Sequence, residues 1–183
     1  MASLTGRNPK VDPSLIHRLF YPQVPLVMAA KHGNRVSAMP VVSYLMASEN
    51  PPMVGVACAP KGFTCRLALK AGSFSLSVLD RSRRDAVSRL AATSGAEVED
   101  KLSEVGLKYE AGEKVKAPVL RDALATIECI LKSSKKAGDH LLLLGSVESA
   151  SASDAFTDRW DYARYRPILY TGWAEGLTLF PGS

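Results

Sequence analysis

The sequence predicts a mainly β protein, an antiparallel barrel with short inserted α-helices. Six or seven apolar segments of strand length follow one another along the chain, and turn residues such as Gly and Asn separate several of them. The segments with helical spacing are short. The regular alternation of strands and long helices that builds a doubly wound parallel sheet is therefore missing.

The first elements are a helix and a hairpin. Asp12 is a candidate N-cap for a short helix over Ser14–Phe20, because its carboxylate can accept from the first helical N–H groups. The apolar run Val24–Ala30 is typical of a buried strand. Gly33 lies in a turn that tolerates positive φ, and Arg35–Ser43 can return as the second strand of a hairpin.

The centre of the chain contains one well-marked helix between two strands. A Pro-Pro pair leads into a strand over Met53–Ala59, since Pro cannot donate inside a sheet ladder. A helix over Phe63–Ala71 ends at Gly72, a residue suited to the left-handed position that closes helices. Ser73–Leu79 alternates small and apolar residues and is predicted to be a strand.

The rest of the chain continues this pattern. Ala86, Val87, Leu90 and Ala91 share one face of a predicted helix. The polar residues 108–119 contain Gly and Pro and are expected to form an excursion from the barrel. The remaining predicted elements are helices over Ser82–Thr93 and Val98–Val105 and strands over Leu124–Lys132, Leu141–Ser149 and Ile168–Trp173. A turn at Ala137-Gly138-Asp139 is predicted to join the first two of these strands.

Length and composition predict a single domain over residues 1–183, with residues 1–12 outside its packed part. The 183 residues are 46% hydrophobic and 22% charged, which excludes a disordered or fibrous chain. No apolar run approaches the roughly 20 residues of a membrane helix, and the start of the chain has no apolar signal region. Three cysteines argue against a disulfide framework and indicate a reducing compartment, most simply the cytoplasm.

The charge of the chain gives a weak preference for anionic ligands. The net charge of +5 is compatible with a phosphorylated cofactor. The dense basic run at residues 81–84 is expected to be a solvated face or turn. Aromatic residues are only 7% and do not interleave with basic ones, so no nucleic-acid partner is predicted.

Familiar catalytic signatures are missing from the sequence. His17, His32 and His140 are far apart and pair with no nearby cysteine at metal-ligand spacing, so no metal site is predicted. Cys58 and Cys65 are seven residues apart and bracket a turn, which favours buried, unreactive thiols. The sequence also lacks a nucleophile elbow, a P-loop and a dinucleotide fingerprint.

Two stretches are candidates for ligand binding. Ser37–Pro52 is rich in small residues and hydroxyls, which let a backbone approach a flat ligand closely, although an ordinary loop with an edge strand is the alternative. Ala59–Thr64 runs from a strand end into a helix N-terminus, where free N–H groups favour an anion. There Thr64 can donate a hydroxyl hydrogen bond and Lys61 adds charge; simple helix capping is the alternative.

These stretches resemble the flavin reductase-like, FMN-binding split-barrel family. The ungapped match from Ser37 to Pro52 retains the family's Ala, first Pro, last Ser and Pro-Pro positions, and Lys61 and Thr64 fit its phosphate turn. The resemblance covers about residues 18–173. The segments that look like the family's entry to its first strand and like three of its later strands are Arg18–Pro22, Gly72–Val78, Gly138–Val147 and Pro167–Trp173.

The chain departs from the family pattern at several side chains. Ser37 replaces the usual Asn, and Val42 replaces a usual Ser. Asn50 replaces the usual Asp, and Arg66 stands where an Asn often follows the Thr. These changes bear on the side-chain contacts to flavin more than on the backbone contacts.

The resemblance implies a split antiparallel β-barrel that binds FMN non-covalently at a homodimer interface. His140 is expected near the flavin or a nicotinamide, where it would supply charge or a hydrogen bond, the alternative being a surface histidine beside a turn. Tyr170 and Trp173 are expected to be core or dimer-contact aromatics. The implied FMN contacts are Ser37, Ala38, Met39, Pro40, Val42, Ser43, Ala47 and Ser48 along the ring and ribityl chain, and Cys58, Ala59, Pro60, Lys61 and Thr64 at the phosphate.

The activity that the resemblance implies is that of an NAD(P)H:flavin oxidoreductase. FMN accepts a hydride from NADH or NADPH and passes electrons to free flavin, ferric iron or a partner protein. The alternative is an FMN-carrying electron-transfer protein without NAD(P)H oxidation of its own. The sequence leaves open the acceptor, the choice between NADH and NADPH, and whether FMN is cofactor or substrate.

Overall fold

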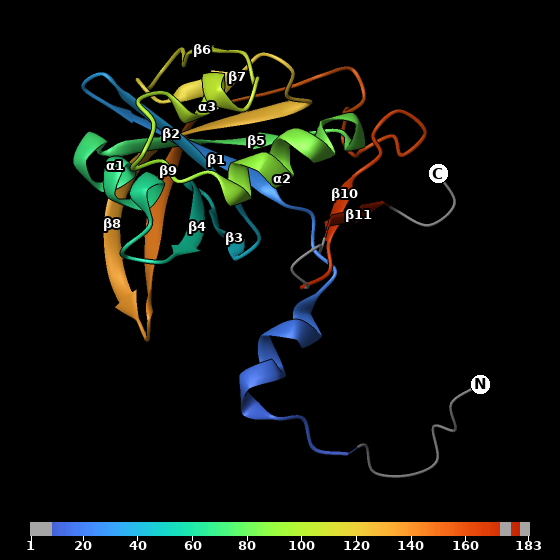
Figure 1. Ribbon diagram of the computed structural model, residues 1–183. Helices are drawn as coiled ribbons and strands as arrows, with labels where there is room; N and C mark the ends of the chain where they lie inside the picture. Colours follow the sequence, from blue (N-terminus) through green and yellow to red (C-terminus); the bar gives the residue numbers. More distant parts are fainter. Residues whose placement is uncertain (1–8, 173–176, 180–183) are drawn as a thin grey trace.

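One seven-stranded antiparallel sheet forms the centre of the protein, in a computed structural model that describes residues 9–172 and 177–179. Figure 1 shows the arrangement. In order of hydrogen-bonded neighbours the strands are β2 (Arg35–Val41), β1 (Leu26–His32), β5 (Ser73–Val78), β8 (Ala125–Ala137), β9 (His140–Ala152), β4 (Pro52–Cys58) and β3 (Tyr44–Glu49). The predicted mainly β, antiparallel class is confirmed.

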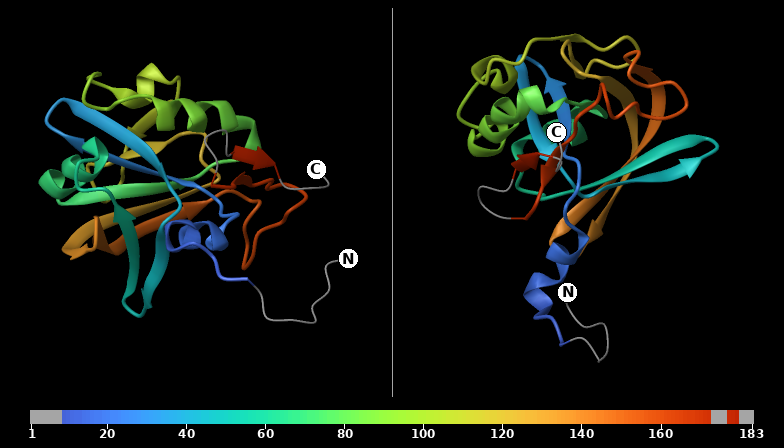
Figure 2. Two further views of the ribbon diagram at one scale, coloured as in Figure 1. Left: turned by 60° about the horizontal axis from the view of Figure 1, so that its bottom comes forward. Right: turned by 90° about the vertical axis from the view of Figure 1, so that its right-hand side faces the viewer.

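The two edge strands of this sheet are consecutive in the chain. Only Val42 and Ser43 join β2 to β3, yet the two strands lie at opposite ends of the hydrogen-bonded order. A link this short holds the strand ends close together, so the sheet must curl round until its edges approach (Figure 2). We call the gap between β2 and β3 the seam. The result is a barrel split along that seam, as predicted.

Two hairpins have the turns that the sequence predicts. Gly33, between β1 and β2, has φ +57°, and Gly138, between β8 and β9, has φ +60°. Glycine occupies this left-handed region without the steric cost that a side chain brings. These turns set the registers in which His32 pairs with Arg35 and Ala137 pairs with His140.

Short helices cover parts of the sheet. The helices are η1 (Pro13–Phe20), α1 (Phe63–Ala71), η2 (Arg81–Arg83), α2 (Arg84–Ala92) and α3 (Lys101–Glu104). The predicted Asp12 cap is confirmed, because its carboxylate accepts the Ser14 N–H at 2.8 Å. α1 has the predicted bounds and ends at Gly72, whose φ is +67°. η1 has no buried residue and projects away from the sheet (Figure 1).

The core has two parts, one on each face of β1. Met28 packs inside the barrel with Phe74 and Leu143. Val27, on the opposite face of the same strand, packs with Leu90 of α2 in an outer layer under the helices. Alternate side chains of a strand point to opposite faces, so β1 is buried on both sides. Its first five residues are therefore all apolar, without the alternation of a half-exposed strand.

Several elements differ from the sequence-based expectation. The segment after Val41 is not a loop throughout, since β3 pairs with β4 and includes Ala47 and Ser48. The register of this pairing shifts between Met46 and Ser48, which leaves Ala47 at the irregularity. β4 begins at Pro52, since Pro is tolerated as the first residue of a strand. The helix expected over Val98–Val105 is shortened to α3. β8 and β9 are longer than predicted, 13 residues each.

Two small sheets complete the described structure. β6 (Tyr109–Ala111) pairs with β7 (Pro118–Leu120) inside the predicted excursion, and β10 (Ile168–Tyr170) pairs with β11 (Leu177–Leu179). The single domain over residues 1–183 stays a prediction; of its expected loose start, residues 1–8 lie outside the described residues, and residues 9–12 are exposed. Within residues 9–172 and 177–179, no helix has the length and apolar character needed to cross a membrane.

Candidate functional site

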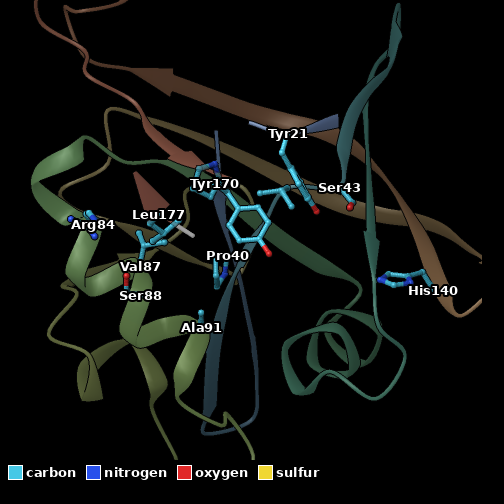
Figure 3. A pocket seen from close by; sticks show the side chains of 12 residues that line it. Tyr21, Pro40, Ser43, Arg84, Val87, Ser88, Ala91, His140, Tyr170 and Leu177 are labelled. Carbon is cyan, nitrogen blue, oxygen red and sulfur yellow. The ribbon is translucent and has the colours of Figure 1, made fainter. Parts of the chain in front are cut away.

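A cavity of about 690 Å³ lies along the seam. Its volume falls within the roughly 300–1,000 Å³ that is typical of small-molecule sites. It is lined by side chains from the N-terminal segment, β2, the link between β2 and β3, α2, β9, β10 and β11 (Figure 3). We call it the seam cavity. It gathers residues that are up to 156 positions apart in the chain, from Tyr21 to Leu177.

The sequence-predicted ring contacts divide between the cavity wall and the core. The seam cavity is lined by Pro40, Val42 and Ser43, because β2 ends here and the chain continues into β3. Ala38 is fully buried in the outer core layer, and Met39 packs against the barrel interior. Ala38 therefore has only its backbone available for a ligand, whereas the Met39 side chain is half-buried and does not line the cavity.

Ala47 and Ser48 lie away from this cavity. They stand near the far end of β3, where Ser48 pairs with Met53 of β4. Neither residue lines the seam cavity. Their predicted contact with the ring or ribityl chain of FMN stays a prediction.

Two tyrosines form the end wall of the cavity. The rings of Tyr21 and Tyr170 meet edge to face, with centroids 4.8 Å apart and planes at 84°. Gly172 allows this packing, since a Cβ there would overlap the Tyr21 ring. Burial, followed by the neighbouring Tyr170, raises the pKa of Tyr21. Tyr170 is thus a half-buried cavity-wall residue rather than a core residue, and Trp173 lies outside the described residues.

One face of α2 forms a side wall. Arg84, Val87, Ser88 and Ala91 line the cavity. These positions have the i, i+3, i+4, i+7 spacing of a single helical face. Arg84 belongs to the basic run that was expected to be a solvated face; it is exposed, but it also borders the cavity. The helical spacing of these residues could be recognised from the sequence, whereas the cavity that this helix face borders could not.

The N-terminus of α1 is the second part of the candidate site. Gly62 is the N-cap residue and makes no side-chain hydrogen bond to the helix. The first N–H groups of a helix need partners, and an uncapped first turn can offer them to an anion. The predicted phosphate contacts Ala59, Pro60 and Lys61 form the exposed turn that precedes this helix.

A buried hydroxyl pair connects this helix to β2. Ser37 and Thr64 are 0% and 3% exposed, and their hydroxyl oxygens are 2.8 Å apart. The structure therefore brings together two predicted site residues that are 27 positions apart. Gly95 lies against this pair, because a Cβ at that position would overlap the Ser37 hydroxyl.

Basic side chains surround the start of α1. The guanidinium of Arg35 lies 4.7 Å from the centre of the Phe63 ring, and that of Arg66 lies 5.7 Å from it. Arg35 also donates to the carbonyls of Gly95, Ala96 and Val98. The sequence pointed to Lys61 alone, since the partners of Arg35 come from a distant loop.

His140 stands between the two parts. It lines the seam cavity, and in Figure 3 it lies apart from the other lining residues, toward α1. Its Nδ1 lies 2.7 Å from Oδ1 of Asp139, and its side chain is 44% exposed. The pKa of Cys65 in α1 is lowered mainly by its hydrogen bond with Cys58, and the nearby His140 contributes in the same direction.

The predicted site contains two thiols in contact. The Sγ of Cys58, at the end of β4, lies 2.7 Å from the Sγ of Cys65 in α1. Both residues are buried, as expected. No group of three or more metal-ligating side chains is found in the described part of the chain.

Comparison with known proteins gives a consistent result. A family model described as a flavin reductase like domain matches residues 17–171. An uncharacterised protein of Aeropyrum pernix is 34% identical over 158 residues, which are 86% of this chain, and the match spans 60% of that protein. A flavin reductase of Pseudomonas putida is 31% identical over 121 residues, 66% of this chain and 67% of that protein.

The fold has a solved counterpart. The crystal structure of an FMN-binding protein from Thermus thermophilus, determined with bound 1-cyclohex-2-enone, superposes with a TM-score of 0.77. The two chains are 30% identical, and the match covers 98% of this chain and 96% of that one.

Proposed function

Because the chain belongs to the flavin reductase-like domain family, we propose that it is an FMN-binding oxidoreductase that takes hydride from NADH or NADPH and reduces a flavin or ferric acceptor. The observation that carries the proposal is the position of His140 between the seam cavity and α1. His140 lines the cavity and lies toward α1, whose uncapped first turn begins at Phe63 (Figure 3). One elongated ligand with a flat end and an anionic end can occupy both the cavity and this turn.

The residues around α1 fit a phosphate group. The uncapped first turn offers backbone N–H groups, and Lys61, Arg35 and Arg66 add positive charge near them. Either hydroxyl of the Ser37–Thr64 pair can donate to the other, which leaves one proton for a further acceptor. The phosphate of FMN is the acceptor that we propose.

The residues of the seam cavity fit a flat ring system. Pro40 and Val42 present apolar surface, Ser43 presents a hydroxyl, and the Tyr21–Tyr170 pair closes one end. When bound, FMN supplies the capacity to accept a hydride and to release electrons. The chain's own contribution is to hold the ring, to exclude water with its apolar walls, and to orient the hydride donor. No protein acid or base is needed for the hydride transfer itself.

Two cavity residues are proposed to bind the nicotinamide cofactor. Arg84 carries a permanent positive charge on the α2 wall and suits a phosphate or pyrophosphate group. His140 lies toward α1 and can donate a hydrogen bond or, when protonated, supply charge. Asp139 accepts at Nδ1 of His140, which leaves Nε2 for the ligand.

We further propose that the functional unit is a homodimer. Leu19 and Phe20 of η1 are 66% and 68% exposed, and Leu45 and Met46 of β3 are 51% and 55% exposed. Apolar side chains of this size on projecting elements indicate a surface that another protein covers. We propose that a second copy of the chain covers this surface, since two-fold pairing is the commonest closed symmetry. A second subunit would also close the open side of the site.

The test begins with flavin titration of the purified protein. Quenching of flavin fluorescence should give a clearly higher affinity for FMN than for riboflavin, because only FMN carries the phosphate. Equal affinities would show that the α1 turn is not a phosphate site. NADH and NADPH oxidation by the FMN-loaded protein, with free flavin or ferric citrate as acceptor, then measures the activity.

The same assay separates the alternative role. An FMN-carrying electron-transfer protein binds FMN but oxidises neither nicotinamide at a catalytic rate. Reduction by dithionite followed by rapid electron release to an acceptor, without NAD(P)H oxidation, would support that role instead.

A further inference from the structure

The two thiols at the base of the proposed phosphate turn are positioned to react with each other. Cys58 and Cys65 are 4% and 0% exposed, and their sulfur atoms are 2.7 Å apart. A disulfide bond is about 2.05 Å long, so the sulfurs need to approach by less than about 1 Å. The short turn between β4 and α1 brings the two residues together, which a spacing of seven in the sequence does not reveal.

The two thiols differ in chemical character. The Cys58 S–H donates to the Cys65 sulfur, and this hydrogen bond, followed by burial, raises the pKa of Cys58. The same hydrogen bond lowers the pKa of Cys65; burial opposes the shift, while the positive charges of Arg66 and His140 add to it. Cys65 also lies in the first turn of α1, where the helix favours an anion.

The third cysteine provides an internal contrast. Burial, followed by the charges of Glu148 and Glu128, raises the pKa of Cys129 to about 12. A thiol of this kind is unreactive. Cys65 is therefore the more acidic thiol of the pair and is assigned as the attacking sulfur, Cys58 is assigned as the thiol that resolves it, and Cys129 is a structural residue.

We propose that Cys58 and Cys65 form a reversible dithiol–disulfide pair whose oxidation state sets the negative charge beneath the phosphate-binding turn. With hydrogen peroxide as oxidant, the Cys65 thiolate attacks one oxygen, the O–O bond breaks and hydroxide leaves, giving a sulfenic acid. The Cys58 sulfur then attacks the Cys65 sulfur and expels the hydroxyl as water. Overall, two thiols lose two electrons and two protons, and peroxide is reduced to two waters.

The charge change acts on the proposed anion site, so this part of the inference rests on the proposed function. In the reduced protein, a negative charge on Cys65 in the first turn of α1 would compete with a bound phosphate for the helix N-terminus and for the charge of Arg66. The disulfide is neutral and removes that repulsion. Oxidation should therefore strengthen FMN binding, by roughly three- to tenfold for one unit charge a few ångströms away.

Thiol counting on the full-length protein tests the bond itself. Fully reduced protein should react with three equivalents of a maleimide after denaturation, since the chain has three cysteines. After treatment with hydrogen peroxide it should react with one, and peptide mapping should find a Cys58–Cys65 link that dithiothreitol reverses. Three remaining thiols, or a sulfinic acid at Cys65 in place of the link, would overturn the proposal.

FMN titration of the reduced and oxidised forms at about pH 8.5 tests the coupling. The oxidised form should bind more tightly, and Cys65→Ser should bind with one affinity whether or not peroxide is added. Cys129→Ala is the matched control and should respond to peroxide as the unaltered chain does. If the disulfide forms without a change in FMN affinity, the proposed coupling between oxidation and FMN binding is overturned. If the Cys58–Cys65 disulfide forms but the protein binds no FMN, the proposed function is overturned, whereas the proposed thiol chemistry is supported.

Discussion

The Ser37–Thr64 hydroxyl pair joins the strand that borders the seam cavity to the helix proposed to hold phosphate. Both hydroxyls are buried, so each depends on the other for a hydrogen bond. Removing one of them leaves the other unpaired. The pair thus carries a structural role and a proposed binding role, and the two can be separated by mutation.

Thr64→Val should weaken both FMN binding and stability. Loss of a hydrogen bond to a charged group costs about 1.5–3 kcal/mol, or roughly 10- to 150-fold in affinity. The unpaired Ser37 hydroxyl should cost about 1–3 kcal/mol of unfolding free energy. The double variant Ser37→Ala/Thr64→Val should regain much of the stability but not the affinity, as measured by urea denaturation and flavin fluorescence. Full FMN affinity in the double variant would reduce Thr64 to a core residue.

Arg84 and Arg83 are neighbours with different surroundings. Arg84 borders the seam cavity, whereas Arg83 pairs with Asp122 at 2.9 Å. Arg84→Ala should raise KM for the nicotinamide cofactor about tenfold or more, since it removes one charged contact, with little change in kcat. Arg83→Ala is the matched control and should leave KM unchanged. Equal effects of the two substitutions would show that only the overall charge of the basic run matters.

At the scale of elements, α3 shows how one carboxylate can hold a loop. Asp100 accepts the N–H groups of Leu102 and Ser103 at 3.1 Å each and the hydroxyl of Tyr109 at 2.7 Å. Burial alone would raise the pKa of Asp100, but the hydrogen bonds from Tyr109 and Ser103 outweigh it and lower the pKa. The carboxylate thereby ties α3 to β6.

Asp100→Asn should destabilise the fold at neutral pH by about 1 kcal/mol, because the neutral amide is a weaker acceptor. The pKa of Asp100 is lowered in the folded state, so its contribution is full above the unfolded pKa, about 3.9, and is lost as pH falls through the folded pKa. Urea denaturation at pH 7 and near pH 3 should show the difference between the two chains shrinking. Glu104→Gln, on the same helix and exposed, is the control; a constant difference at both pH values would contradict the assignment.

Elements with local boundary signals could be predicted from the sequence. α1 was predicted with its bounds, because a Pro-Lys-Gly break precedes it and Gly72 ends it. The β1–β2 and β8–β9 turns were predicted from glycines that adopt positive φ. β3 was missed, since Leu45 and Met46 are exposed and the strand is held by pairing with β4 rather than by its own alternation.

The candidate site was predictable only where its residues are adjacent in sequence. The cavity-lining residues Pro40, Val42 and Ser43 lie in one stretch of the sequence and were identified together as candidate flavin contacts. Tyr21 and Arg84 were not identified, because the barrel brings them to the cavity from distant positions. The contact between the two thiols was missed for a different reason: a spacing of seven residues across a turn does not show whether the turn brings the two sulfurs together.

At the scale of the whole molecule, the exposed apolar residues of η1 give a test of assembly. Light scattering should find a homodimer, about twice the 19.7 kDa of the chain. The double variant Leu19→Ser/Phe20→Ser should shift the protein toward monomer without lowering its melting temperature at high dilution, since both side chains are already exposed. The matched control is Val11→Ser, on the approach to η1. A monomer that still carries FMN would overturn the dimer proposal.

The seam cavity has walls from both ends of the described chain. Gln23 and Tyr170 exchange two backbone hydrogen bonds, of 3.1 and 2.8 Å, that fix one end of the cavity. A ribosome therefore has to release the chain as far as Tyr170 before this wall exists, even though the strands β1 to β5 emerge much earlier. Cofactor capture is thus confined to the period after Tyr170 has emerged. A released chain truncated before residue 168 should fold much of its sheet and still fail to retain flavin.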